Sequence, residues 1–408
     1  MKITKCRVCK NDKFHQILDL GETPLANAFI EKKSKKKEHF YPLNVVWCDK
    51  CGLLMIDEVV PPEIMFKNYI YVSGTSPTLK KHFGDLARDA ISTYNVKPGE
   101  LVVDIASNDG TLLKEFKNQG LSVQGIDPAE NISEIARNSG IPTETDFINE
   151  KVALKVKKNI GAAKLITATN VVAHINDLDE LFRSIKIMLQ PDGIFIIEVP
   201  YMVDLIENVE FDTIYHEHLS YFAVGPIKIL FDNNDFKLIR VKHVSIHGGT
   251  IRLFGARKNS SLNIDKSVEE FLIREESMNV NKIEYYKNFA LKVENLKVNL
   301  LKTLKDIKEN GKKIAGYGAS AKGNTLLNYF GIDNLTLEYI GDLNKLKQNQ
   351  ITPGTHIPVV NPIFIKENQI DYLLILAWNF KTEIMKQQNY IREWGGKFII
   401  PIPQVEIL

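Results

Sequence analysis

The sequence predicts an α/β protein with a small cysteine-bearing module at its N-terminus and two larger Rossmann-like domains after it. Apolar runs alternate with amphipathic stretches between residues 101 and 199, and the same alternation returns between residues 313 and 402. That pattern is typical of parallel sheets covered by helices. All four cysteines lie before residue 52, and 408 residues are too many for one ordinary core. We therefore expect three parts: residues 1–70, residues 71–260 and residues 261–408.

The N-terminal module carries two Cys-x-x-Cys turns, Cys6-Arg-Val-Cys9 and Cys48-Asp-Lys-Cys51. Four thiolates from two such turns can close a tetrahedral zinc site, and no other cysteine competes for the metal. The alternative is two redox or disulfide pairs, but neither pair lies in a thioredoxin-like βαβ context. Because four sulfur ligands leave no open coordination position, zinc held by Cys6, Cys9, Cys48 and Cys51 is expected to be structural.

The first α/β domain begins with the apolar run Leu101–Ile105, and further runs follow at 123–126, 164–168 and 193–199. Between the last two, residues 178, 181, 182, 185, 188 and 189 place apolar side chains on one face of a helix, which ends before Gln190-Pro-Asp-Gly193. The spacing leaves room for a helix between successive strands. It predicts a doubly wound parallel sheet.

The turn after the first of these strands predicts a cofactor site. Val102-Val-Asp104-Ile-Ala106-Ser-Asn108-Asp-Gly110 places an acid at the strand end and small residues where a ligand must approach the backbone. The next strand ends about 20 residues later in Asp127-Pro128, where a carboxylate can accept hydrogen bonds from both ribose hydroxyls. A nicotinamide site would need Gly-x-Gly-x-x-Gly, which is absent, so we expect S-adenosylmethionine. Its predicted ligands are Asp104, Ser107, Asn108, Gly110, Asp127, Pro128, Asp146, Phe147 and Asn170.

A dense group of ionisable side chains follows the strand that ends at Glu198-Val-Pro200. Tyr215-His216-Glu217-His218 and Tyr221 lie within seven residues, at the expected carboxyl end of the sheet. One histidine alone would be read as a structural residue, but this concentration favours acid–base chemistry. The pattern is not His-Glu-x-x-His, so a metalloprotease helix is unsupported.

The third part begins with a charged, helix-prone stretch at residues 264–310 that contains no proline or glycine, and we expect a helical connector or hairpin there. Apolar runs at 313–317, 335–340, 372–376 and 397–402 then predict a second sheet. Its first turn, Gly316-Tyr-Gly318-Ala-Ser320-Ala-Lys322, opens a helix whose N-terminal amides and lysine suit an anion. The alternative is a plain strand–helix turn, and the absence of Gly-x-x-x-x-Gly-Lys-[Ser/Thr] argues against an NTPase.

Taken together, these motifs resemble those of the sugar C-methyltransferases that branch nucleotide-linked deoxysugars. The two Cys-x-x-Cys pairs, the segments 107–112 and 211–221, His247-Gly-Gly-Thr-Ile-Arg252 and the segment 316–325 all match that family's pattern, in the family's order. The resemblance covers nearly the whole chain. Ala106 stands where the family usually has glycine, and its methyl group is expected to crowd the cofactor; Ser320 stands where proline is usual.

The resemblance implies S-adenosylmethionine-dependent methylation of a 4-ketosugar. A base removes the proton beside the ketone, and the resulting enolate attacks the sulfonium methyl. His218 matches the family's base, Glu217 and Tyr215 support it, and a tyrosine of Tyr69-Ile-Tyr71 borders the sugar. A histidine is a suitable base at neutral pH because its ordinary pKa is near ~6.5. Substrate contacts are expected from His174, Tyr201, His247, Arg252, Ser320, Lys322, Asn324, Asp342, Trp378 and Asn379.

Composition narrows the possible partners. The formal net charge of +2, from 52 basic and 50 acidic residues, gives no electrostatic support for nucleic acid. No window approaches the ~20 apolar residues of a membrane span, and the first residues lack the apolar core of a secretory signal. We expect a cytoplasmic monomer that binds a ketosugar linked to dTDP or another nucleotide. The remaining alternatives are a sugar-nucleotide-binding protein without methyl transfer and an epimerase-like enzyme that uses the same enolate.

Overall fold

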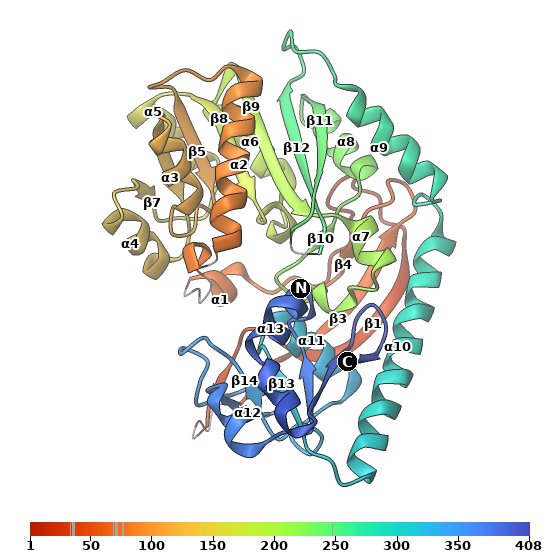
Figure 1. Cartoon of the computed structure of the whole chain (residues 1–408). Coiled ribbons are helices and arrows are strands. Elements are labelled where there is room, and N and C mark those ends of the chain that lie inside the picture. Colours follow the sequence, from red (N-terminus) through yellow and green to blue (C-terminus); the bar gives the residue numbers. More distant parts are fainter. Residues whose placement is uncertain (33, 35–36, 68, 70–71, 76, 247) are drawn as a thin grey trace.

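The computed structural model describes residues 1–32, 34, 37–67, 69, 72–75, 77–246 and 248–408. Its parts lie one above the other in Figure 1, with the central α/β domain above the C-terminal one and the N-terminal strands between them. Within these residues, no helix combines the length and the apolar composition that crossing a bilayer requires.

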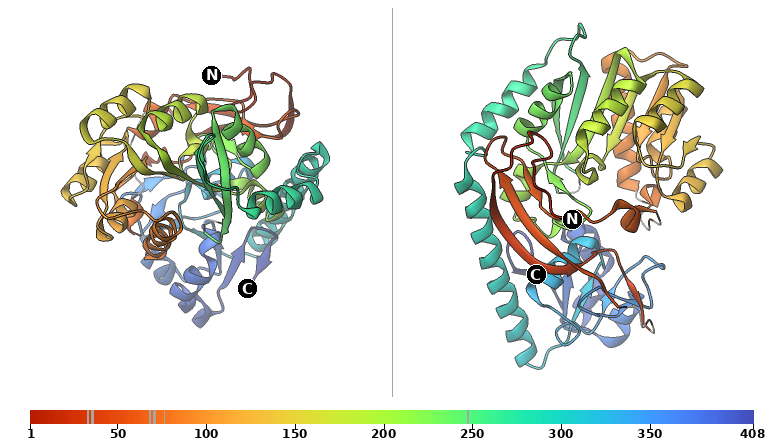
Figure 2. Two further views of the ribbon diagram at one scale, coloured as in Figure 1. Left: turned by 90° about the horizontal axis from the view of Figure 1, so that it is seen from above. Right: turned by 180° about the vertical axis from the view of Figure 1, so that it is seen from behind.

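The N-terminal sheet has the strand order β1-β3-β4-β10. Strands β1 (Phe14–Pro24), β3 (Phe40–Cys48) and β4 (Leu54–Ile56) come from the module itself, whereas β10 (Ser220–Tyr221) comes from the central domain. The long β1–β3 hairpin, red in Figures 1 and 2, extends beside helix α10 toward the C-terminal domain. At its far end β2 (Ile30–Glu31) pairs with β15 (Gln350–Ile351), and helix α1 (Pro62–Phe66) then leads to the central domain.

The central sheet has seven strands in the order β11-β12-β9-β8-β5-β6-β7, and only β12 runs against its neighbours. Its strands are β5 (Leu101–Ile105), β6 (Ser122–Ile126), β7 (Thr143–Glu144), β8 (Ala163–Thr169), β9 (Leu189–Pro200), β11 (Phe236–Val244) and β12 (Thr250–Arg257). The helices around it are α2 (Pro77–Tyr94), α3 (Thr111–Asn118), α4 (Glu130–Asn138), α5 (Glu150–Ile160), α6 (Leu178–Met188), α7 (Met202–Glu207) and α8 (Val224–Asn233).

Alternate residues of the central strands enter two separate cores. Val102 packs with buried side chains of α2 and α3, and its neighbour Val103 packs with those of α5 and α6. Successive side chains of a strand point to opposite faces, so both faces are covered, as the sequence predicts for a doubly wound sheet. One boundary differs: β9 begins at Leu189, directly after α6, so residues 190–193 extend the strand instead of forming a separate loop.

The connector consists of two helices, α9 (Lys266–Ser277) and α10 (Ile283–Glu309), separated at residues 278–282. Asn279 adopts a left-handed backbone there, with φ of 59°, which ends the first helix. Helix α10 runs along one side of the molecule from the central to the C-terminal domain (Figures 1 and 2). Its buried residues recur every three or four positions, so one apolar face packs on both domains.

The C-terminal sheet has the order β16-β14-β13-β17-β18-β19, and all its strands except β19 are parallel. They are β13 (Ile314–Tyr317), β14 (Ile340–Gly341), β16 (Val359–Val360), β17 (Tyr372–Ile375), β18 (Lys397–Ile400) and β19 (Glu406–Ile407), with helices α11 (Ala321–Phe330), α12 (Ile363–Asn368) and α13 (Lys381–Gln387). The run expected at 335–340 contributes only its last residue to β14. Asp333 accepts a hydrogen bond from the Leu335 amide at 2.9 Å, which forms a turn where the strand was expected.

Candidate active site

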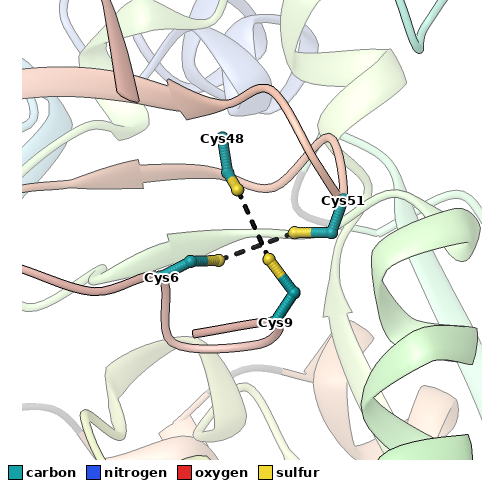
Figure 3. A group of neighbouring side chains, drawn as sticks. All are labelled: Cys6, Cys9, Cys48 and Cys51. Atoms are coloured by element: carbon teal, nitrogen blue, oxygen red, sulfur yellow. Dashed lines mark hydrogen bonds between the residues drawn. The ribbon is translucent and has the colours of Figure 1, made fainter. Parts of the chain in front are cut away.

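The four cysteines converge on one point (Figure 3). Their sulfur atoms all lie within 4.8 Å of one another, and the Cys6–Cys51 and Cys9–Cys48 pairs are each 3.5 Å apart. A tetrahedral zinc with Zn–S bonds of about 2.3 Å separates its sulfurs by roughly 3.8 Å, so the arrangement fits that ion. Disulfide bonds, at about 2.05 Å, do not fit these distances. The expected zinc ligands are therefore together, at the end of β3.

A cavity of about 1030 Å³ opens at the carboxyl ends of the parallel strands of the central sheet. Eight of the predicted cofactor residues line it: Asp104, Ser107, Asn108, Asp127, Pro128, Asp146, Phe147 and Asn170. Gly110 does not line it. With φ of 77° it begins helix α3 in the left-handed region, and a Cβ atom there would lie 3.0 Å from Ile141. Its place in the motif is explained by the turn.

The loop after β5 has two residues in an unusual backbone conformation. Ala106 and Asn108 both have positive φ angles, 56° and 50°, a region that residues with a Cβ atom avoid. Asp104, at the strand end, is 2% exposed and accepts a hydrogen bond from the Thr167 hydroxyl at 2.6 Å. Burial raises the pKa of Asp104 to about 7. Ala106 lines the cavity that the expected cofactor would enter.

Asp127 closes the next strand and supports the same loop. One carboxylate oxygen accepts from the Asn108 amide and the other from the Ala129 amide, both at 2.9 Å. Each oxygen keeps a second lone pair, so ribose hydroxyls can still bind. Gly125 leaves space for the Ser107 side chain of this loop, because a Cβ atom there would lie 2.3 Å from the Ser107 hydroxyl.

His218 lies in the wall of the same cavity. Its Nδ1 is 2.8 Å from the Thr213 carbonyl oxygen, which can only accept, so the neutral ring carries its proton on Nδ1 and its lone pair on Nε2. The ring packs against Tyr215, with centroids 4.1 Å apart, and against His174 at 4.9 Å. Burial lowers the pKa of His174 to about 4, which keeps that ring neutral at physiological pH.

Tyr215, Tyr69 and Glu217 surround the histidine in different ways. Tyr215 and Tyr69 line the cavity, whereas Glu217 does not. Burial raises the pKa of Tyr215 well above its ordinary value, so the phenol stays protonated and can donate. The Glu217 carboxylate accepts from Asn27 at 2.6 Å and from the Tyr69 hydroxyl at 3.3 Å, and burial raises its pKa. Glu217 therefore holds Tyr69 instead of facing the cavity.

The predicted substrate residues do not all meet at this cavity. His174 and Lys322 line it. The Lys322 ammonium lies 3.8 Å from Glu210 and 4.9 Å from the ring centre of Trp378, whose indole NH donates to Asp212 at 2.7 Å. Lys322 belongs to α11, so the C-terminal domain borders the cavity of the central one.

The other predicted substrate residues that the structure describes lie outside the cavity lining. Tyr201 donates to the buried Glu275, and Arg252 pairs with the buried Glu198. Ser320 caps α11 through the Gly323 amide, Asn324 donates to the Ala26 carbonyl, and Asp342 accepts from the Ala319 amide. Trp378 is mostly buried and Asn379 half-buried. Tyr71 and His247 lie outside the described residues.

Sequence reasoning missed several residues of this region. Phe66 lines the cavity and stacks on His174 with centroids 5.6 Å apart. Asn176 also lines it, and Asn27 reaches Glu217 from the segment after β1. Phe66 is one apolar residue of a short helix, and Asn27 is about 190 residues from its partner, so nothing local marks either one.

Comparison with known proteins assigns the family. The chain is 33% identical, over 407 residues, to the C-methyltransferase NovU of Streptomyces niveus, with coverage of 100% of this chain and 97% of that protein. It belongs to the same C-methyltransferase family. Family models agree: residues 245–403 match a C-methyltransferase C-terminal domain, residues 82–241 a methyltransferase domain, and residues 6–66 a domain described as a putative zinc binding domain.

More remote similarities cover part of this C-methyltransferase. It is 25% identical over 97 residues, 23% of the chain and 41% of the relative, to a ubiquinone biosynthesis O-methyltransferase of Vibrio parahaemolyticus. Among solved structures, the magnesium protoporphyrin IX methyltransferase of Synechocystis with bound S-adenosylmethionine matches at 16% identity and a TM-score of 0.33. That match covers 44% of this chain and 79% of the other.

The expected cofactors agree with these assignments. The zinc-binding match includes all four converging cysteines, and the methyltransferase match includes every strand end where S-adenosylmethionine is expected. The chain is therefore a methyl-transferring enzyme with a four-cysteine zinc site.

Proposed function

We propose that this enzyme uses S-adenosylmethionine to methylate a carbon of a nucleotide-linked 4-keto-deoxysugar, by attack of a base-generated enolate on the sulfonium methyl. The observation that carries the proposal is one continuous cavity. It joins the strand ends with Asp104 and Asp127 to His218 and Tyr215, and extends to Lys322 of the C-terminal domain. Of the three parts expected from the sequence, residues 1–70 would bind zinc, residues 71–260 would bind the cofactor and residues 261–408 would contact the nucleotide.

His218 is the proposed base. Because Nδ1–H donates a hydrogen bond to the Thr213 carbonyl, Nε2 is the atom that can take the proton from the carbon beside the ketone. The His174 ring beside it is neutral, so it adds no positive charge that would oppose protonation of His218 at Nε2. Tyr215 keeps its phenol proton and can donate to the enolate oxygen, as an oxyanion-hole donor does.

When bound, S-adenosylmethionine supplies the electrophilic methyl group. The Asp127 carboxylate can accept hydrogen bonds from its ribose hydroxyls, and Phe147, which lines the same cavity, offers an aromatic ring for its adenine. Asp146 is exposed and can accept from the adenine amino group. Lys322 of the C-terminal domain also lines the cavity, and its ammonium suits the anionic part of a nucleotide sugar.

The proposal is tested by incubating the protein with methyl-labelled cofactor and a panel of nucleotide ketosugars. Transfer of label to a sugar carbon, with release of S-adenosylhomocysteine, is the expected result. Proton exchange at the sugar carbon without label transfer would instead indicate an epimerase-like enzyme. Binding of the nucleotide sugar with neither reaction would indicate a binding protein and would overturn the proposal.

A further inference from the structure

Arg7 is buried inside the first zinc-binding turn, between Cys6 and Cys9 (Figure 3 shows the two cysteines). Its side chain is 3% exposed, although it carries a charge that proteins rarely bury without partners. Within the part of the chain that the structure describes, its guanidinium forms no ion pair with a carboxylate, although the charge of Asp57 acts on it. It is directed instead toward the loop of the proposed base.

The guanidinium joins three segments that are distant in sequence. Nη1 donates to the carbonyl oxygens of Ile56 and Leu219, both at 2.9 Å, and Nε donates to the side-chain oxygen of Asn176 at 3.0 Å. Ile56 ends β4 of the zinc module, Leu219 follows His218 directly, and Asn176 lines the cavity. One rigid, planar group therefore fixes three separate pieces of backbone and side chain.

The backbone around these contacts leads to the two histidines. The Leu219 amide donates to the Ala173 carbonyl at 2.7 Å, beside His174, and the Leu219 carbonyl also accepts from the Ile56 amide at 3.2 Å. Strand β10 then continues this pairing, with Ser220 opposite Met55 of β4. Strand β10, which begins two residues after His218, is thus the edge strand of the zinc-module sheet (Figure 1).

We infer that Arg7 is a positioning residue, through which the zinc-bound turn fixes the backbone of His218 and His174 for proton removal. The inference rests on the proposed role of His218. Cys6 and Cys9 would both bind the zinc, and the bound metal would fix the backbone from which Arg7 extends. The zinc module then has a role in the chemistry besides its role in folding.

The first test compares Arg7→Met with Lys5→Met, which removes a charge from an exposed position beside the same turn. We expect Arg7→Met to keep one zinc per chain and an S-adenosylmethionine Kd within about twofold of wild type. Its kcat should fall roughly 10- to 100-fold, since small displacements of a catalytic group cost that much. Lys5→Met should match wild type throughout.

A second readout does not depend on turnover. Hydrogen–deuterium exchange of the backbone amides at residues 216–222 should be about tenfold faster or more in Arg7→Met, and the ring nitrogen signals of His218 should shift in NMR spectra. If wild type shows no reaction with any ketosugar, the proposed function fails, but these two measurements still decide whether Arg7 fixes the loop.

If Arg7→Met loses its zinc, two further variants test the inference. Asn176→Ala removes only the partner of Nε and leaves the cysteine turn intact, and Arg7→Lys keeps the charge without the planar fork. Both should give intermediate losses of kcat and of amide protection, with zinc retained. Wild-type turnover and protection in these variants, or in a zinc-retaining Arg7→Met, would overturn the inference.

Discussion

Replacing Arg252 by methionine tests whether this residue stabilises the central sheet or contacts substrate. Arg252 of β12 is paired directly across the sheet with Glu198 of β9, and their exposed fractions are 2% and 0%. The guanidinium hydrogen-bonds one carboxylate oxygen, while the other lies 2.7 Å from His82 Nε2. Burial alone would raise the pKa of Glu198, but the hydrogen bond from His82 and the charge of Arg252 hold it below its usual value.

Removing the arginine leaves a buried carboxylate without its cation, which costs about 3–5 kcal/mol. For a domain of this size that loss lowers the melting temperature by roughly 6–20 °C. The penalty should shrink as the pH falls, because Glu198 can then be buried as the neutral acid. Removing both partners, in Arg252→Met/Glu198→Leu, should recover most of the loss, since apolar replacements of buried pairs are often nearly neutral.

The assay is thermal and urea unfolding, with Arg240→Met as the matched control. Arg240 is partly exposed and pairs with Asp89 at 3.2 Å, and Asp89 also pairs with Lys242 at 3.2 Å and Arg252 at 3.5 Å, so the loss of Arg240 should cost only about 1 kcal/mol or less. Arg252 does not stabilise the sheet if Arg252→Met unfolds at the wild-type midpoint, or if the double variant is no more stable than the single one. A selective rise in the KM for the nucleotide sugar, without loss of stability, would support the substrate contact implied by the resemblance instead.

Four further results are expected. Cys48→Ser should release zinc and destabilise the N-terminal module, seen by metal analysis and by earlier unfolding of that module. Asp127→Ala should weaken S-adenosylmethionine binding by roughly 1.5–3 kcal/mol in calorimetry, and an unchanged Kd would remove it from the ribose role. Ala106→Gly should tighten cofactor binding and raise the melting temperature slightly, because it relieves a left-handed residue that costs about 1–2 kcal/mol and removes a methyl group from the cavity wall. The folded pKa of Asp104 lies above its unfolded value, so the folded state binds more protons and the free energy of unfolding should fall as the pH rises from about 4 to about 7. Asp104→Asn should flatten that slope in urea titrations.

Sequence reasoning predicted best where a local pattern and its structural consequence coincide. The spacing within each Cys-x-x-Cys turn predicts that both of its cysteines bind the same zinc ion. The four sulfur atoms lie close together, as this requires. The strand Leu101–Ile105 has the bounds expected from its apolar run. Because the carboxyl ends of parallel strands lie at one edge, Asp104, Asp127 and Asn170 line one cavity, although nothing in their separate segments requires contact.

The predictions for the C-terminal domain depended on strand ends alone, which do not fix how two domains face each other. Lys322 reaches the cavity, but Asp342 of the next strand end binds the Ala319 amide within its own domain. Arg7 could not be found from the sequence, because its partner Leu219 is 212 residues away and carbonyl oxygens carry no sequence signal. Strand β10 could not be found from the sequence either, because it is only two residues long.

In the proposed mechanism His218 removes the proton from the carbon beside the ketone. Solvent deuterium exchange at that carbon of a nucleotide 4-ketosugar, measured without methyl donor, tests it most directly. His216→Ala is the matched control, because His216 lies two residues away, with its Nε2 on the Pro42 carbonyl at 3.2 Å, and does not line the cavity. Wild type and His216→Ala should both exchange the proton, whereas His218→Ala should exchange it roughly 10²–10⁴ times more slowly. Exchange by His218→Ala at the wild-type rate would show that His218 is not the base.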